Sequence, residues 1–193
     1  MRAFLAVNLD EKMREKVAEV QEKLKKRTSG IRWVKPELLH LTLKFLGDIR
    51  AEELKAFEQH LEKAAREVAA FHLTFNRLGA FPGLRNPRVI WIGTQTGTAQ
   101  LVLLASKIEN IFKSTANFQS ASNKVKDTTP FVPHLTIGRR QKNSDLLFPM
   151  EIFRESFDCK YALHVDRFFL MQSTLYSSGP VYTPVKEFLL DSF

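Results

Sequence analysis

The chain has 193 residues, of which 44% are hydrophobic and 26% charged, as in a soluble globular protein with one domain or two small lobes. A formal net charge of +8 favours a polyanionic partner, either nucleic acid, an anionic membrane surface or a phosphorylated small molecule, with solubility alone as the alternative. A single cysteine, Cys159, excludes an internal disulfide. No apolar run approaches about 18 residues, so no membrane span is expected. The N-terminus has no secretory pattern, and we therefore expect a cytoplasmic protein.

Short apolar or alternating runs predict strands, and apolar residues spaced three or four apart predict amphipathic helices. In chain order, the predicted strands cover residues 2–9, 31–35, 40–47, 71–78, 88–94, 134–139, 162–176 (one long strand or two) and 181–190. The predicted helices cover approximately residues 11–26, 51–70 and 98–117. Proline and glycine predict a loop at 81–87, and a polar, basic stretch predicts another at 120–129.

A strand, a helix and a strand that contains His-Leu-Thr follow one another in residues 2–47 and again in residues 88–138. The lead-ins also match, WVKPELLHLT in the first unit and FVPHLT in the second. The length of this repeat favours two similar lobes over a solenoid array. We therefore expect an α+β fold in which residues 1–193 form a single two-lobed domain. Each lobe would contribute one His-x-Thr strand to a cleft with approximate twofold symmetry.

The tripeptide His-Leu-Thr occurs three times, beginning at His40, His72 and His134. In a strand, residues i and i+2 share a face, so the imidazole and the hydroxyl lie side by side while the leucine points into the core. Two such strands across a cleft would supply one imidazole as acid and another as base. Because threonine favours strands, chance occurrence is the alternative for each copy. The copy at His72 lies outside the repeat, follows a predicted helix directly and lacks a proline lead-in.

Arg139 follows His134 by five positions and could bind phosphate oxygens with its guanidinium. Strict alternation would place it on the leucine face, whereas a bend at Gly138 would turn it toward the histidine face. An acid, a base and cationic donors suit the hydrolysis of a phosphodiester without a metal. A 2′,3′-cyclic phosphate on RNA is a natural substrate, because ring strain helps and only water needs activation.

The segments HLTLKFLG and PHLTIGR, in this order, resemble the paired His-x-Thr-x signatures of the two-histidine phosphoesterases, and the RNA 2′,3′-cyclic phosphodiesterases (2′–5′ RNA ligases) most of all. The resemblance extends over the chain through RAFLAVNL, WVKPELLHLTLKFLG, FPGLRNPRVIWIG, FVPHLTIGR and STLYSSGPVYTPV. It implies a bilobal fold of two antiparallel sheets with helices outside. It also implies cofactor-free hydrolysis of RNA 2′,3′-cyclic phosphate ends, tRNA-derived ends among them, to 2′-phosphomonoesters, and the reverse ATP-independent 2′–5′ joining.

The resemblance also implies a role for each residue of the two motifs. His40 would protonate the leaving 3′ oxygen, and His134 would accept a proton from the attacking water. The phosphate would be bound by the residues that follow the two histidines, Thr42, Thr136 and Arg139. Phe45 occupies the position in the first motif that Arg139 occupies in the second.

Four further residues are candidates for substrate contacts, namely Lys44, Phe45, Trp91 and Tyr182. Lys44 is expected on the face of His40 and Thr42, with a solvated surface position as the alternative. Phe45 and Trp91 could stack on a terminal base, with a place in the apolar core as the alternative. Tyr182 is expected to line the cleft.

Outside this set, Lys124 and Lys126 in the loop at 120–129 could contact the RNA backbone, unless the loop is simply mobile. We expect His60, His72 and His164 to be structural, with His72 on a strand surface.

Three other functions remain open from the sequence. The chain could be a basic RNA- or nucleotide-binding module whose histidines only contact phosphate. A metallohydrolase is disfavoured, because no paired acidic cluster or His-x-x-x-His accompanies the histidines. The third alternative is an enzyme with the same two histidines that acts on a small cyclic phosphate. No heptads or exposed apolar stripe demand a protein partner, so we expect a monomer.

Overall fold

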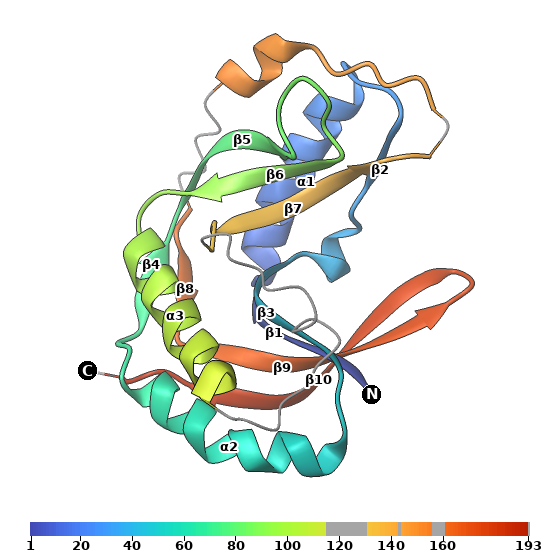
Figure 1. Ribbon diagram of the computed structural model, residues 1–193. Helices are drawn as coiled ribbons and strands as arrows, with labels where there is room; N and C mark the ends of the chain where they lie inside the picture. The colour runs from blue at the N-terminus through green and yellow to red at the C-terminus, as the bar shows by residue number, and fades with distance from the viewer. Residues whose placement is uncertain (115–130, 143, 156–160, 193) are drawn as a thin grey trace.

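The computed structural model describes residues 1–114, 131–142, 144–155 and 161–192, and Figure 1 shows how its helices and antiparallel sheets are arranged. The α+β class expected from the sequence is confirmed. The basic loop with Lys124 and Lys126 lies outside the described residues, as does Cys159.

The first four-stranded sheet has the strand order β10-β9-β1-β3, and every neighbouring pair is antiparallel. Its strands are β1 (Arg2–Asn8), β3 (His40–Asp48), β9 (Arg167–Tyr176) and β10 (Gly179–Leu189). The central strand β1 is a continuous apolar run because both of its faces are covered. One face packs into the main hydrophobic core, and the other carries Phe4 and Ala6 beside Met171.

The second four-stranded sheet has the order β2-β7-β6-β5 and is also antiparallel. It consists of β2 (Ile31–Trp33), β5 (Phe75–Phe81), β6 (Val89–Thr94) and β7 (His134–Arg140). The two His-x-Thr strands are β3 in the first sheet and β7 in the second, and they contact each other. The leucine of each motif, Leu41 or Leu135, is buried as the strand alternation predicts.

Three α-helices of the described chain cover the sheets, namely α1 (Glu11–Lys25), α2 (Ala51–Arg66) and α3 (Thr98–Ser114). Helix α1 begins after Asp10, whose carboxylate accepts a hydrogen bond from the Met13 backbone N–H at 2.8 Å. Its apolar stripe, spaced by four and three residues, is buried as predicted and consists of Met13, Val17, Val20 and Leu24. The predicted boundaries differ most at α2, which ends at Arg66 rather than near residue 70.

The two repeated units exchange their helices. Helix α1 follows β1 of the first sheet but lies behind the second sheet (Figure 1), where the Gln21 side chain donates to the carbonyl of Ile137 at 2.9 Å. Helix α3 follows β6 of the second sheet but contacts β3 of the first, through an ion pair of 2.6 Å between Lys44 and Glu109. One hydrophobic core is therefore continuous between the sheets.

The segment predicted as one strand from Phe71 is broken at Thr74 into β4 (Phe71–Leu73) and β5. The hydroxyl and the backbone of Thr74 form hydrogen bonds with the turn before α3. These hydrogen bonds end the pairing of β4 and change the direction of the chain before β5. Strand β4 pairs with β8 (Leu163–Val165) in a two-stranded sheet that was not predicted. His72 is exposed there, opposite His164, and belongs to neither four-stranded sheet.

Two 3₁₀ helices of the described residues were not predicted, namely η1 (Pro36–Leu38) and η3 (Met150–Arg154). The first is short because Pro36 starts it and Leu39 already has an extended backbone. It leads directly into His40, so the proline lead-in of the first motif sets where β3 begins.

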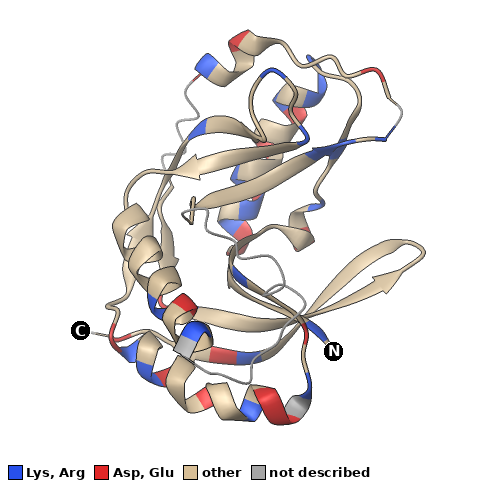
Figure 2. Cartoon of the chain, in the orientation of Figure 1, with Lys and Arg blue, Asp and Glu red and all other residues tan. Residues whose placement is uncertain are grey.

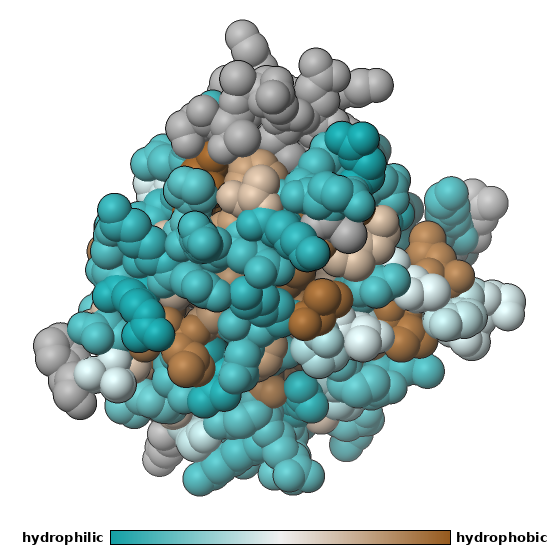
Figure 3. Space-filling view, turned by 90° about the horizontal axis from the view of Figure 1, so that it is seen from below, coloured by the Kyte–Doolittle hydropathy of each residue, from teal (hydrophilic) through white to brown (hydrophobic). Residues whose placement is uncertain are grey.

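Charged residues lie mainly on the outer helices and loops, and basic residues gather at the far end of β7 (Figure 2). Viewed from below, the surface is mainly hydrophilic, with apolar residues scattered over it (Figure 3). Within the described ranges, no helix is both long and apolar enough to cross a membrane.

Candidate active site

His40 and His134 occupy equivalent positions as the first residues of β3 and β7. The His40 Nδ1 lies 2.8 Å from the carbonyl oxygen of Leu38, and the His134 Nδ1 lies 2.7 Å from that of Val132. A carbonyl oxygen only accepts, so each Nδ1 carries a hydrogen and donates it. The same backbone contact therefore leaves Nε2 of each ring as the atom that can exchange a proton with a ligand.

Aromatic rings enclose both imidazoles. Phe4 and Tyr182 lie 4.8 and 5.1 Å from the His40 ring, measured between centroids. Phe81 contacts the His134 ring edge-on at 4.9 Å, and Trp91 is farther away at 6.2 Å. Each histidine is thus held by aromatic neighbours from its own sheet.

This enclosure lowers the pKa of both histidines below 6.5, because burial disfavours the charged imidazolium. The backbone hydrogen bond to each Nδ1 raises the pKa and partly offsets burial. The positive charge of Arg139 lowers the pKa of both rings, and His134 adds a smaller effect on His40. Because Arg139 acts on both histidines, the three groups share one electrostatic environment.

Arg139 reaches the histidine face because of a β-bulge at Ile137. In the pairing of β6 with β7, Trp91 lies opposite Thr136 but Ile90 lies opposite Gly138, so Ile137 is an extra residue. The insertion shifts the alternation by one, and Arg139 lies opposite Val89 on the face of Thr136. The predicted face of Arg139 is therefore correct, although the cause is a bulge beside Gly138 rather than a glycine bend.

The first motif has a bulge at the same point, and it corrects the expectation for Lys44. In the pairing of β1 with β3, Ala6 lies opposite Thr42 and Leu5 opposite Lys44, which leaves Leu43 as the extra residue. Lys44 therefore points to the core side, where its side chain is only 12% exposed and paired with Glu109. The expectation that Lys44 shares the face of His40 is wrong because the bulge reverses the alternation.

The same bulge brings Phe45 to the face of His40 and Thr42. Phe45 lies opposite Phe4 in the strand pairing, with ring centroids 6.2 Å apart. It is 62% exposed, so the alternative of a core position does not apply. Phe45 and Arg139 are equivalent residues of the two motifs, as the sequence suggested.

Trp91 is half-buried on the face of Thr136, and its indole packs over Gly79 on the neighbouring strand β5. A Cβ atom at position 79 would lie 2.2 Å from two ring atoms of Trp91. We therefore expect Gly79→Ala to displace the indole and to lower the free energy of unfolding by about 1–3 kcal/mol, a typical cost of overpacking. Chemical denaturation measures this difference.

Gly83→Ala is the matched control, because a Cβ atom at position 83 would meet no atom within 4 Å. Its free energy of unfolding should equal or exceed that of the wild type. If Gly79→Ala is as stable as Gly83→Ala, the packing of the Trp91 indole does not require a glycine at position 79.

Four residues near the histidines were missed from the sequence. Phe4 and Phe81 contact His40 and His134 from neighbouring strands. Asn8 and Arg14 line a pocket with His40, and Tyr182, which was predicted for the cleft, lines it too. The alternation in β1 marks Phe4 and Asn8 as one face, but only strand pairing with β3 shows that this face carries His40.

Within residues 1–114, 131–142, 144–155 and 161–192, no group of three or more His, Cys, Asp or Glu residues is arranged to hold a metal ion.

Comparison with known proteins identifies the family of the chain. Residues 7–91 match the family model described as LigT like Phosphoesterase. A curated relative from Archaeoglobus fulgidus, named RNA 2′,3′-cyclic phosphodiesterase, is 35% identical over 97% of this chain and 99% of its own length. A relative with the same name from Thermotoga maritima is 32% identical over 97% of this chain and 94% of its own.

Solved structures give the same result. The crystal structure of TT0787 from Thermus thermophilus covers 100% of this chain and 99% of its own, at 30% identity and a TM-score of 0.83. The Escherichia coli LigT complexed with 3′-AMP covers 98% of this chain and 97% of its own, at 28% identity and a TM-score of 0.73. The identity over nearly the full length and the shared fold show that the chain belongs to the LigT-like phosphoesterase family, among the RNA 2′,3′-cyclic phosphodiesterases.

Proposed function

We propose that the protein hydrolyses RNA 2′,3′-cyclic phosphate ends to 2′-phosphomonoesters, with His40 as the general acid and His134 as the general base. The observation that carries this proposal is the matched geometry of the two histidines, each fixed by a backbone carbonyl through Nδ1 with Nε2 left for chemistry. Neutral imidazole accepts a proton at Nε2, and imidazolium donates one, so the pair can divide the two proton transfers.

The reaction needs two bonds to change at phosphorus. His134 Nε2 takes a proton from water as the water oxygen attacks phosphorus. The bond from phosphorus to the 3′ oxygen breaks, and His40 Nε2 gives its proton to that oxygen, which leaves a 2′-phosphate and a free 3′ hydroxyl. Proton exchange with solvent then restores the starting states.

The residues around the pair suit the phosphate. Thr42 and Thr136 share the faces of the two histidines, and Arg139 adds a positive charge that acts on both rings. Hydroxyls and a guanidinium donate hydrogen bonds to the phosphate oxygens and stabilise negative charge in the transition state. Phe45 and Trp91 offer aromatic surfaces on the same faces for a terminal base.

The net charge of +8 supports RNA over a neutral substrate, since a polyanion is attracted to a basic protein. The reverse reaction, ATP-independent 2′–5′ joining, uses the same two proton transfers and belongs to this proposal. A monomeric state, a cytoplasmic location and tRNA-derived ends as substrates stay predictions from the sequence.

The test is turnover of a short oligoribonucleotide that ends in a 2′,3′-cyclic phosphate, in excess EDTA. We expect turnover that the chelator does not reduce. Loss of activity in EDTA, restored by a divalent metal, would favour the metallohydrolase, and RNA binding without turnover would favour the binding module. Turnover of a small cyclic nucleotide that equals that of the oligonucleotide would remove the preference for a polymer.

The pH dependence of kcat/KM follows from the lowered pKa of both histidines. Activity should rise with pH as His134 loses its proton and fall as His40 loses its own. Because both pKa values lie below 6.5, the maximum of kcat/KM should lie on the acidic side of neutrality. Arg139→Gln removes a positive charge that disfavours both imidazolium forms, so both limbs of the profile should move to higher pH.

Lys23→Gln is the control for this experiment, because it also removes one positive charge but lies exposed on α1. Its pH profile should coincide with that of the wild type. Limbs that stay in place in Arg139→Gln would mean that Arg139 does not act on the two rings.

A further inference from the structure

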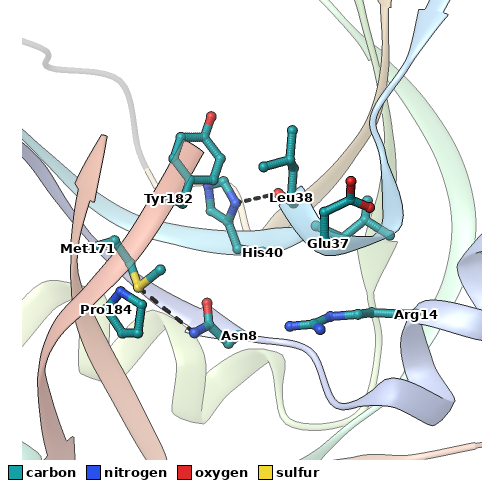
Figure 4. Close-up of a pocket in the computed structure, with 9 residues that line it drawn as sticks. Asn8, Arg14, Glu37, Leu38, His40, Met171, Tyr182 and Pro184 are labelled. Atoms are coloured by element: carbon teal, nitrogen blue, oxygen red, sulfur yellow. Dashed lines mark hydrogen bonds between the residues drawn. The ribbon is translucent and has the colours of Figure 1, made fainter. Parts of the chain in front are cut away.

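A cavity of about 190 Å³ lies beside His40 and extends beyond it toward helix α1 (Figure 4). His40, Tyr182, Asn8, Arg14 and Glu37 are among the residues that line it. The cavity therefore borders His40, one of the two candidate catalytic histidines, but most of its polar groups have no part in the two proton transfers. If a ligand is bound at His40, the atoms next to its reacting group would lie beside these polar side chains.

The side chain of Arg14 is the main unexplained group in this cavity. It extends from α1 with its guanidinium directed at Asn8 (Figure 4). Its Nε is buried, and no acceptor for it exists among the described residues. A buried N–H of a charged group without an acceptor is unfavourable, so such a group usually has a missing partner. A guanidinium fits phosphate oxygens in a bidentate manner, which makes an anionic phosphate the natural partner.

Asn8 supplies a second donor at the right place. It lies directly opposite His40 in the pairing of β1 with β3, and so shares the face of the catalytic histidine. Among the described residues, its amide nitrogen donates a hydrogen bond to the sulfur of Met171, at 3.8 Å, and sulfur is a weak acceptor. One amide hydrogen therefore stays available for a ligand between His40 and Arg14.

Glu37 also lines the cavity, is exposed, and forms no ion pair with Arg14 or with another described residue. A carboxylate there repels an anion that approaches without other contacts. The cavity should therefore accept a phosphate only when the rest of the substrate is already held at His40.

We propose that Arg14 and Asn8 bind the 5′-phosphate of the nucleotide whose 2′,3′-cyclic phosphate is hydrolysed. This inference rests on the proposed function, because the cyclic phosphate at His40 defines which group comes next. In an RNA end, the nearest further anion is the phosphate on the 5′ oxygen of the same ribose. Such a subsite would distinguish a chain end from a free cyclic nucleoside phosphate without reading the base.

The experiment compares uridine 2′,3′-cyclic phosphate with the same molecule carrying a 5′-phosphate. The wild type should show a kcat/KM about tenfold higher for the 5′-phosphorylated substrate, as expected for one charge-assisted contact. In Arg14→Gln, this ratio should fall to about one, and Arg14→Lys should restore part of it because the positive charge returns. Glu37→Gln should raise the ratio, because it removes a repulsive charge.

Lys23→Gln is again the matched control, with one positive charge removed from an exposed position of α1, and it should keep the wild-type ratio. Equal losses for both substrates in Arg14→Gln would assign Arg14 a structural role and overturn the proposal. A wild type that hydrolyses both substrates equally well would overturn it as well, while leaving the proposed function intact.

A binding measurement keeps the two proposals separable if no turnover is found. By calorimetry, the wild type should bind adenosine 2′,5′-bisphosphate about tenfold more tightly than adenosine 2′-phosphate, and Arg14→Gln should lose this difference. Equal affinities of the wild type for the two ligands would contradict a 5′-phosphate subsite whatever the outcome for catalysis.

Discussion

His40→Ala and His134→Ala are each expected to lower turnover of an RNA 2′,3′-cyclic phosphate by about a thousandfold, within the range of a lost general acid or base. Each variant removes the only imidazole that its strand presents to the substrate, while the fixed position of the other remains. Single-turnover kinetics on a cyclic-ended oligoribonucleotide measures the loss. RNA affinity should be largely kept, because the proposed phosphate contacts of Thr42, Thr136 and Arg139 would remain.

His72→Ala is the control with the same tripeptide context. His72 is exposed on β4 opposite His164, outside both four-stranded sheets, so its turnover should stay within about twofold of the wild type. Affinity that falls in proportion to activity in His40→Ala would indicate a binding module instead of an enzyme. A large loss in His72→Ala would show that the choice of two histidines among three is wrong.

Gln21→Met is expected to destabilise the protein by about 1–3 kcal/mol, since methionine keeps the volume but leaves the Val34 carbonyl without its donor. The Ile137 carbonyl loses the amide but keeps the backbone N–H of Val34 at 2.9 Å. Gln21 is a buried polar residue of α1, only 3% exposed, and its amide donates to Val34 and Ile137 at 2.8 and 2.9 Å. Ile137 is the extra residue of the bulge that brings Arg139 to the histidine face. Because the amide contacts the bulge residue directly, the substitution should also lower activity by loosening the bulge.

Chemical denaturation and kcat/KM on the same preparations test both parts of this expectation. Gln100→Met on α3 is the matched control, because that glutamine is exposed. Its stability should differ from the wild type by less than about 0.5 kcal/mol. If Gln21→Met loses stability but keeps the wild-type pH profile and activity, the amide supports the fold without positioning Arg139.

Local patterns were sufficient for most elements of the fold. The apolar stripe of α1 and the alternation at the start of β3 and β7 correctly indicated which side chains are buried. The leucine that follows each histidine, Leu41 or Leu135, is buried, as strand periodicity requires. These features depend on residues that are near neighbours in the sequence, which is why they could be predicted.

Positions after the two bulges could not be assigned from alternation alone. Leu43 and Ile137 are ordinary apolar strand residues, and only the pairing with β1 and β6 makes each of them an extra residue. Lys44 was therefore placed on the wrong face, and Arg139 on the correct one for an incomplete reason. A bulge is a property of two strands, whereas the sequence pattern describes one.

Long-range packing accounts for the other omissions. The aromatic neighbours Phe4 and Phe81 are distant in sequence from the histidines that they contact. The exchange of α1 and α3 between the sheets likewise depends on how the two repeated units meet. In the sequence, Arg14 is one more charged residue on an amphipathic helix, and the cavity beside His40 is what distinguishes it.

The most direct test of the central claim is the identity of the product. Phosphorus NMR of the reaction on a cyclic-ended oligoribonucleotide, in excess EDTA, distinguishes a 2′-phosphate from a 3′-phosphate. If His40 protonates the 3′ oxygen while His134 activates water, the wild type should yield the 2′-phosphate alone. A 3′-phosphate, a mixture of both isomers or no product would contradict the assignment of the two histidines.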